Sequence, residues 1–192
     1  MPAGADSQTR LIFLLGGARS GKSAYAETWG REYTLERGGS LLFVATAQPF
    51  DAEMQARIER HRTERPSEWH TLEAPLNVGA AIEQAFAARH YDVVVLDCVT
   101  LLAGNALLPL PDDCSEDEAD AAIQPEIDAL LAAYRATNAA WLVVSNEVGM
   151  GVVPPTPLGR TFRDVLGRAN QRIALAADEV YLLVAGIAWK LR

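Results

Sequence analysis

Near its N-terminus the chain reads Leu11-Ile12-Phe13-Leu14-Leu15-Gly16-Gly17-Ala18-Arg19-Ser20-Gly21-Lys22-Ser23. The first five residues are apolar and predict a short buried strand, whereas the residues from Lys22 onwards have the composition of a helix. The residues between them have the Gly-x-x-x-x-Gly-Lys-Ser spacing of a phosphate-binding loop. A strand, this loop and a helix, in this order, favour a P-loop nucleotide-binding fold over a glycine-rich turn that binds nothing.

Each residue type in this loop has a chemical role in binding phosphate or its metal ion. The glycines let the chain turn so that successive backbone N–H groups converge on phosphate oxygens, at the positive end of the following helix. Lys22 is expected to reach the β- and γ-phosphates, and the Ser23 hydroxyl is expected to bind Mg²⁺. The sequence therefore predicts a site for a purine nucleoside triphosphate with Mg²⁺.

The rest of the chain alternates short apolar runs with longer segments of helical period. Strands are expected at residues 11–15, 41–46, 91–96, 140–145 and 179–185, and helices at residues 22–37, 52–62, 76–89, 119–137 and 158–176. This alternation is typical of a P-loop NTPase-like three-layer α/β sandwich with a mostly parallel central sheet and helices on both faces. We expect residues 1–192 to form a single domain, residues 1–10 to be flexible and residues 107–120 to form a solvated acidic loop.

Composition narrows the class of partner. The 192 residues carry a formal net charge of −8, which argues against binding to nucleic acid or to an anionic membrane. The longest apolar stretch, residues 93–102, is about half as long as a membrane span and is interrupted by Asp97. Cys98 and Cys114 are too few for a disulfide framework or a zinc site. We expect a soluble cytoplasmic protein that acts on a small molecule.

A second metal ligand is predicted at the end of another apolar run. Val93-Val94-Val95-Leu96-Asp97 is a buried strand that ends in a carboxylate, as a Walker B element does. Asp97 would then bind Mg²⁺ opposite Ser23, directly or through water. The alternative is an Asp that only ends a strand and caps a turn with Thr100.

One histidine lies where a P-loop protein does not require one. In the predicted helix 52–62, Met54, Ile58 and His61 fall on one stripe, so the imidazole faces the protein. Such a histidine is commonly a half-buried structural residue. Three guanidinium groups nearby favour a catalytic interpretation, because cations keep an imidazole neutral and nucleophilic and also bind phosphate; they belong to Arg57, Arg62 and Arg65.

Several blocks together carry a resemblance to a known family. They are the phosphate loop, Ala45-Thr46-Ala47-Gln48, Arg57-Ile58-x-x-His61-Arg62-x-x-Arg65-Pro66-x-x-Trp69, Asp97-Cys98-Val99-Thr100 and the run from Ser145-Asn146-Glu147 to Pro154. Their order and spacing resemble the bifunctional adenosylcobinamide kinase / adenosylcobinamide-phosphate guanylyltransferases of cobalamin biosynthesis. The resemblance covers essentially everything after the first ten residues, although some relatives carry Glu in place of Asp97. The acidic residues 112–120 match no family block, and Trp189 stands in an unexpected place.

The resemblance implies two reactions at one nucleotide site. Adenosylcobinamide is phosphorylated with ATP or GTP, and the product then accepts GMP from GTP through a GMP-histidine, for which the matching position is His61. A homotrimer is implied as well. The implied nucleotide contacts are Gly16, Gly17, Ala18, Arg19, Ser20, Gly21, Lys22, Ser23, Thr46, Ala47, His61, Arg62, Thr63, Glu64, Glu73 and Asp97.

Other polar residues keep two interpretations. Glu147 follows a predicted strand and could activate the acceptor hydroxyl as a general base, or it could anchor the glycine-containing loop 149–157 behind it. Four arginines of the helix 158–176 are expected to be solvated or interfacial, with phosphate contact as the alternative: Arg160, Arg163, Arg168 and Arg172. His70 and His90 are expected on the surface in loops.

Two other functions remain open on the sequence. One is a simple P-loop kinase of a small molecule, in which His61 is structural. The other is a regulatory nucleotide switch that hydrolyses slowly and signals to a protein partner. A covalent GMP intermediate would separate both from the transferase.

Overall fold

The computed structural model describes residues 9–192 and, for Arg37, Glu53, Met54, Arg57 and Glu64, the backbone only. Seven strands form one sheet: β1 (Arg10–Gly16), β2 (Leu41–Ala45), β3 (His70–Glu73), β4 (Val93–Asp97), β5 (Ala140–Val144), β6 (Glu179–Val184) and β7 (Ile187–Lys190). The helices are α1 (Lys22–Arg37), α2 (Ala52–Glu64), α3 (Val78–Ala88), α4 (Val99–Leu107), α5 (Glu116–Ala136) and α6 (Pro157–Ala176).

The strand order is β3-β2-β4-β5-β1-β6-β7, and every pair is parallel except β6 with β7. In the parallel part, the ends of β2, β4 and β5 are in register, with Ala45 opposite Asp97 and Asp97 opposite Val144. Strand β1 lies beside β5 and runs into the phosphate loop. The carboxyl ends of these strands therefore meet at one edge of the sheet, where open α/β folds bind ligands.

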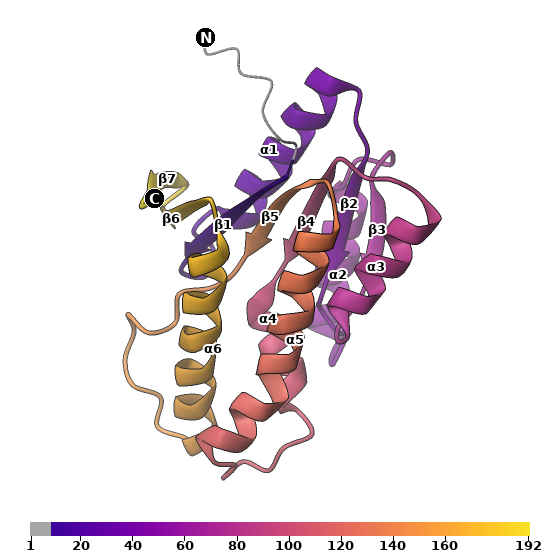
Figure 1. Cartoon of the computed structure of the whole chain (residues 1–192). Coiled ribbons are helices and arrows are strands. Elements are labelled where there is room, and N and C mark those ends of the chain that lie inside the picture. The colour runs from indigo at the N-terminus through magenta and orange to yellow at the C-terminus, as the bar shows by residue number, and fades with distance from the viewer. Residues whose placement is uncertain (1–8) are drawn as a thin grey trace.

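Alternating side chains of the buried strands supply two apolar cores, one on each face of the sheet. Leu11 and Phe13 of β1 point into the core covered by α3, α4, α5 and α6, whereas Ile12 and Leu14 point into the core covered by α1. Helices α3, α5 and α6 lie side by side in front of the sheet in Figure 1. The predicted three-layer sandwich is confirmed, and it explains why these strands read as continuous apolar runs.

All five predicted strands and all five predicted helices are present, with shifts of a few residues at their ends. Three elements were not predicted. Strand β3 is short, polar and only partly buried, so it has no apolar run; α4 follows Asp97 so closely that its apolar residues extend the pattern of β4. Strand β7 is an exposed edge strand that contains Trp189.

The expectation of a loop over residues 107–120 was wrong in its second half. Helix α5 already begins at Glu116, because Ser115 and Glu118 form a reciprocal capping box and Glu116, Asp117 and Glu118 occupy its first turn. Acidic side chains stabilise a helix at this end through the helix dipole. The acidic run is therefore a helix start, which polarity alone does not distinguish from a loop.

Three smaller predictions, on the N-terminal segment, on His70 and His90 and on membrane spans, can also be compared with the structure. Residues 1–8 of the segment expected to be flexible lie outside the described residues, while Arg10 already belongs to β1. His90 is exposed in a connection, as predicted. His70 is exposed too, but it begins β3 instead of lying in a loop, and its ring stacks on Tyr91, whose hydroxyl contacts its Nδ1. None of the helices in the described part of the chain is long and apolar enough to cross a membrane.

Candidate active site

A cavity of about 400 Å³ lies at the carboxyl edge of the sheet. That volume is within the range of small-ligand sites. Its walls come from the phosphate loop, α1, the ends of β2, β4 and β5, and the inner side of α2. The lining includes nine residues predicted to bind nucleotide or metal: Ala18, Arg19, Lys22, Ser23, Ala47, His61, Arg62, Glu73 and Asp97.

The phosphate loop has the shape that its glycines predict. Gly16 has φ +154°, and a Cβ atom there would lie 2.4 Å from the Leu183 carbonyl oxygen and 2.6 Å from Ser20 Oγ. Gly21 has φ +98°, and its Cβ would lie 3.1 Å from the Gly186 Cα. Both positions therefore require glycine, for reasons of conformation and of space. At Gly17, by contrast, a Cβ atom would meet nothing within 4 Å.

The C-terminal hairpin supports this loop from behind. The Gly186 N–H donates to the Ser20 carbonyl at 2.9 Å, and the Leu183 carbonyl of β6 closes off the space beside Gly16. No motif predicts this contact, since the two segments are far apart in the chain and neither β6 nor β7 carries a phosphate-binding pattern. Trp189 therefore lies in a hairpin that supports the loop.

Lys22 is held over the loop. It is only 6% exposed, and its Nζ donates to the carbonyls of Gly16 at 2.9 Å and Gly17 at 2.7 Å. Burial lowers the pKa of Lys22, while the charge of Asp97 acts in the opposite direction. These carbonyls stabilise the ammonium group beside the cavity, so that it can contact a phosphate by a rotation of the side chain.

Ser23 and Asp97 both line the cavity, from α1 and β4. The Asp97 carboxylate has no hydrogen bond within residues 9–192, and the Thr100 hydroxyl instead accepts from the Asn146 N–H at 2.7 Å. This arrangement does not support the alternative in which Asp97 caps a turn with Thr100. A hydroxyl and an unpaired carboxylate are hard oxygen donors, as Mg²⁺ requires, and Mg²⁺ commonly takes only one or two protein ligands beside phosphate and water.

Thr46 acts on the backbone rather than in the cavity. Its hydroxyl accepts from the Cys98 N–H and donates to the Cys98 carbonyl, each at 2.8 Å. Asn105 donates to the Thr46 carbonyl at 2.7 Å. These bonds fix the ends of β2 and β4 relative to each other, so Thr46 is buried while Ala47 beside it lines the cavity.

Helix α2 brings His61 to the same cavity as Lys22. His61 is half-buried, whereas Arg62 is exposed and pairs with Glu59 and Glu73, each at 3.9 Å. Thr63 is also exposed, and its hydroxyl donates to the Arg60 carbonyl at 2.9 Å. The predicted contact at Glu64 and the Arg57 guanidinium expected near His61 concern side chains that lie outside the described ones. The structure thus unites the loop and the histidine, which the sequence pattern treated separately.

Glu147 lies behind the phosphate loop. Its Oε1 accepts from the Gly149 N–H at 2.7 Å, and its own N–H donates to the Gly16 carbonyl at 3.0 Å. Glu147 is not among the residues that line the cavity. These contacts are those of the anchoring interpretation, and a role as general base stays a prediction.

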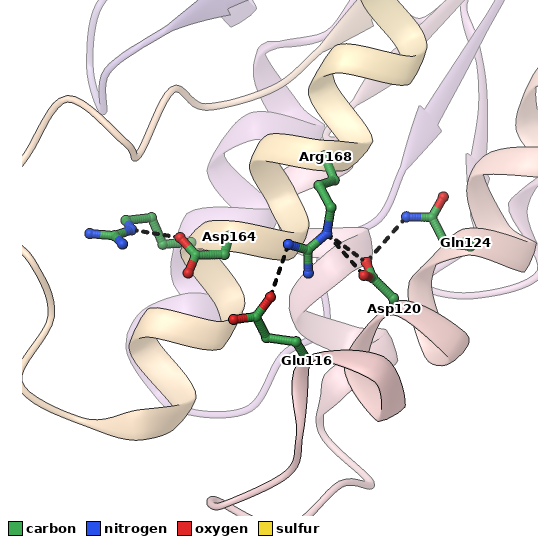
Figure 2. A network of polar contacts seen from close by, with 6 residues as sticks. Glu116, Asp120, Gln124, Asp164 and Arg168 are labelled. Carbon is green, nitrogen blue, oxygen red and sulfur yellow. Dashed lines mark hydrogen bonds and ion pairs between the residues drawn. The ribbon is translucent and has the colours of Figure 1, made fainter.

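The arginines of α6 have partners elsewhere. Arg168 pairs with Glu116 and Asp120 of α5, as Figure 2 shows, and the Asp120 hydrogen bond raises the pKa of its guanidinium. Arg172 contacts Gln124 and Asp128 of the same helix. Arg163 pairs with Asp164, and Arg160 donates to the Pro154 and Pro155 carbonyls. These contacts tie α6 to α5 and to the preceding loop, so we do not assign the four arginines to phosphate binding.

Several cavity residues were not singled out by the sequence. Glu27 lies one helical turn after Ser23, so its spacing is the signal that could have identified it. Phe43 lies in the middle of β2 and Asn146 two residues after the end of β5, and only the strand order shows that both reach one cavity. Gln55 and Glu59 line the cavity from α2.

Residues 12–191 match the protein family described as cobinamide kinase / cobinamide phosphate guanyltransferase. The bifunctional adenosylcobalamin biosynthesis protein CobU of Escherichia coli is 42% identical over 187 residues, which cover 95% of this chain and 99% of that protein. CobU of Salmonella typhimurium is 40% identical over the same shares. The bifunctional protein CobP of Pseudomonas aeruginosa is 38% identical over 180 residues, covering 93% of this chain and 95% of its own.

Among solved structures, a KaiC-like protein of Pyrococcus horikoshii superposes with a TM-score of 0.52 at 14% identity, over 93% of this chain and 72% of that one. This similarity concerns the fold, and it agrees with the P-loop NTPase-like architecture predicted from the sequence. The sequence matches extend over both the phosphate loop and the His61 segment. The chain belongs to the cobinamide kinase / cobinamide phosphate guanyltransferase family, whose two activities are those of transferases.

Proposed function

We propose that this protein phosphorylates adenosylcobinamide with ATP or GTP and then transfers GMP from GTP to adenosylcobinamide phosphate through a GMP-histidine at His61. The observation that carries the proposal is the shared cavity of Lys22 and His61 in a member of this family. A phosphate cradle and an imidazole in one cavity can serve a γ-phosphoryl transfer and an attack on the α-phosphorus in turn.

In the kinase step, the substrate hydroxyl attacks the γ-phosphorus. The new O–P bond forms as the bond from the γ-phosphorus to the bridging oxygen breaks, and the nucleoside diphosphate leaves with that electron pair. Lys22 and the loop N–H groups stabilise the charge on the phosphates. Glu147 is the candidate acceptor of the hydroxyl proton, for which its carboxylate must leave the Gly149 amide.

Mg²⁺ fits the same end of the cavity, with Ser23 and Asp97 as its protein ligands. When bound, it neutralises charge on the phosphate oxygens. The unpaired carboxylate of Asp97 supports this assignment.

In the transfer step, a neutral ring nitrogen of His61 attacks the α-phosphorus of GTP. The N–P bond forms, the bond from the α-phosphorus to the bridging oxygen breaks, and pyrophosphate leaves with the electron pair, while the other ring nitrogen gives up its proton to solvent. A phosphate oxygen of adenosylcobinamide phosphate then attacks the same phosphorus, the P–N bond breaks, and the imidazole recovers the proton. The product is adenosylcobinamide-GDP.

The remaining properties follow from the same proposal. The substrate is a corrinoid, and the net charge of −8 argues against nucleic acid or a membrane as a partner. Both cysteines are free, which suits a reducing cytoplasm. All seven strands join one sheet, in support of a single domain. The assembly expected by resemblance is a homotrimer, which sedimentation would test.

Labelling with α-³²P GTP tests the proposed intermediate. The protein should acquire label that is stable in alkali and lost in acid, as a phosphoramidate is, and His61→Ala should abolish it. His90→Ala is the matched control, because His90 is exposed and lies outside the cavity. Added adenosylcobinamide phosphate should discharge the label into product. An unlabelled wild-type protein that still transfers the γ-phosphate would contradict the proposal and leave a simple kinase.

A further inference from the structure

Arg65 lies directly after the last residue of α2, four residues beyond His61. At this spacing two side chains share one side of a helix, and both residues line the cavity. The Arg65 guanidinium carbon lies 3.8 Å from the ring centroid of Phe43 on β2. The planar cation therefore stacks on a fixed aromatic ring beside the imidazole.

This guanidinium has no anionic partner among the described side chains. Within the described part of the chain it makes no hydrogen bond or ion pair, and its Nε is buried without an acceptor. Burial lowers the pKa of Arg65. The charges of Glu27, Asp97 and Glu73, which lie beyond ion-pair distance, offset this effect only in part. A half-buried guanidinium that has no carboxylate partner among the described residues is a strong candidate for anion binding.

The other described cations of the cavity differ from Arg65. Lys22 donates to loop carbonyls, and Arg62 pairs with two carboxylates. Arg19 also lines the cavity, but it is exposed on the loop. Of Arg62 and Arg65, the two arginines predicted to lie near His61 whose side chains are described, Arg65 combines cavity contact, partial burial and the lack of a carboxylate partner.

We propose that Arg65 binds the α-phosphoryl group that His61 accepts from GTP. This inference rests on the proposed function. Lys22 and the loop are placed for the outer phosphates, whereas Arg65 is one helical turn from the attacking imidazole. Two parallel N–H donors can hold the oxygens of the α-phosphate as negative charge builds up there, and they take no proton in the step.

The assignment predicts a selective defect. Arg65→Met should slow single-turnover labelling by α-³²P GTP by about 10²- to 10³-fold, the usual cost of removing one such donor. Arg65→Lys keeps the charge but not the paired donors or the stacking, so it should recover part of this loss. Phosphoryl transfer from γ-³²P ATP should fall much less, because we assign the γ-phosphate to Lys22 and the loop N–H groups. Arg60→Met, on the exposed side of α2, is the matched control.

Two outcomes would overturn the assignment. Labelling of Arg65→Met at the rate of Arg60→Met would show that the guanidinium does not act on the α-phosphate. Equal losses of both activities with a lowered melting temperature, and no recovery in Arg65→Lys, would show a structural role. Failure of the wild-type protein to label refutes the proposed function itself, whereas a labelled wild type with an undiminished Arg65→Met refutes this inference alone.

Discussion

The phosphate loop and helix α2 contribute to one cavity but differ in how firmly they are held. The loop is fixed by glycine conformations, by Lys22 and by the hairpin behind it. None of the described side chains of α2 is fully buried, and its ion pairs are long and exposed. A site for two reactions benefits from this difference. The phosphates need one fixed cradle, whereas two nucleophiles attack different atoms: the acceptor hydroxyl attacks the γ-phosphorus and His61 attacks the α-phosphorus.

The largest effect on activity is expected at the phosphate loop, the firmly held side of the cavity. Lys22→Met should slow both phosphoryl and guanylyl transfer by about 10²- to 10³-fold, because both use the same phosphate contacts. The free energy of unfolding should change by less than about 1 kcal/mol, since the substitution also removes a costly buried ammonium group. Steady-state rates and denaturant titration measure the two quantities. A defect confined to one reaction would mean that the two reactions do not share the cradle.

At Gly16, the hairpin behind the phosphate loop leaves room for glycine only. Gly16→Ala should destabilise the protein by about 2–4 kcal/mol, because the new Cβ would overlap the Leu183 carbonyl and φ is unfavourable there. Gly17→Ala should cost less than about 1 kcal/mol, since the space at that position is open. Thermal unfolding compares the two variants. Equal costs would show that the hairpin does not constrain the loop.

A smaller effect on stability is expected where Thr46 joins the ends of β2 and β4. Thr46→Val keeps the shape of the side chain and removes its two hydrogen bonds to Cys98, leaving a buried N–H without its acceptor. We expect a loss of about 1–3 kcal/mol in the free energy of unfolding. Urea titration would detect it, and a loss below about 0.5 kcal/mol would contradict the view that these bonds hold β2 to β4.

The smallest effect is expected on α2. Arg62→Gln removes two exposed ion pairs at 3.9 Å, and such pairs contribute about 0–1 kcal/mol. Unfolding should therefore be almost unchanged, and the α2 amides should exchange with deuterium faster than those of β1 and β5. Protection of α2 equal to that of the central strands would remove the contrast between the two regions.

The elements that the sequence predicted share a local signal. Residues 11–15, 93–97 and 140–144 are apolar along their whole length because helices cover both faces of the sheet. Strand β3 and α4 lacked such a signal, since one is polar at an edge and the other follows β4 almost without a break. Within the site, the loop was predicted from its spacing, and His61 from its helical stripe and the family resemblance.

By itself, the sequence determined the phosphate loop, the α/β class and the family, because these depend on residue order and spacing over short stretches. Only the tertiary structure decided which residues meet. It placed Leu183 of β6 against Gly16, stacked Arg65 on Phe43 without an anion, and gave the α6 arginines partners on α5. Such contacts depend on strand order and helix packing, which bring together segments that no local pattern connects.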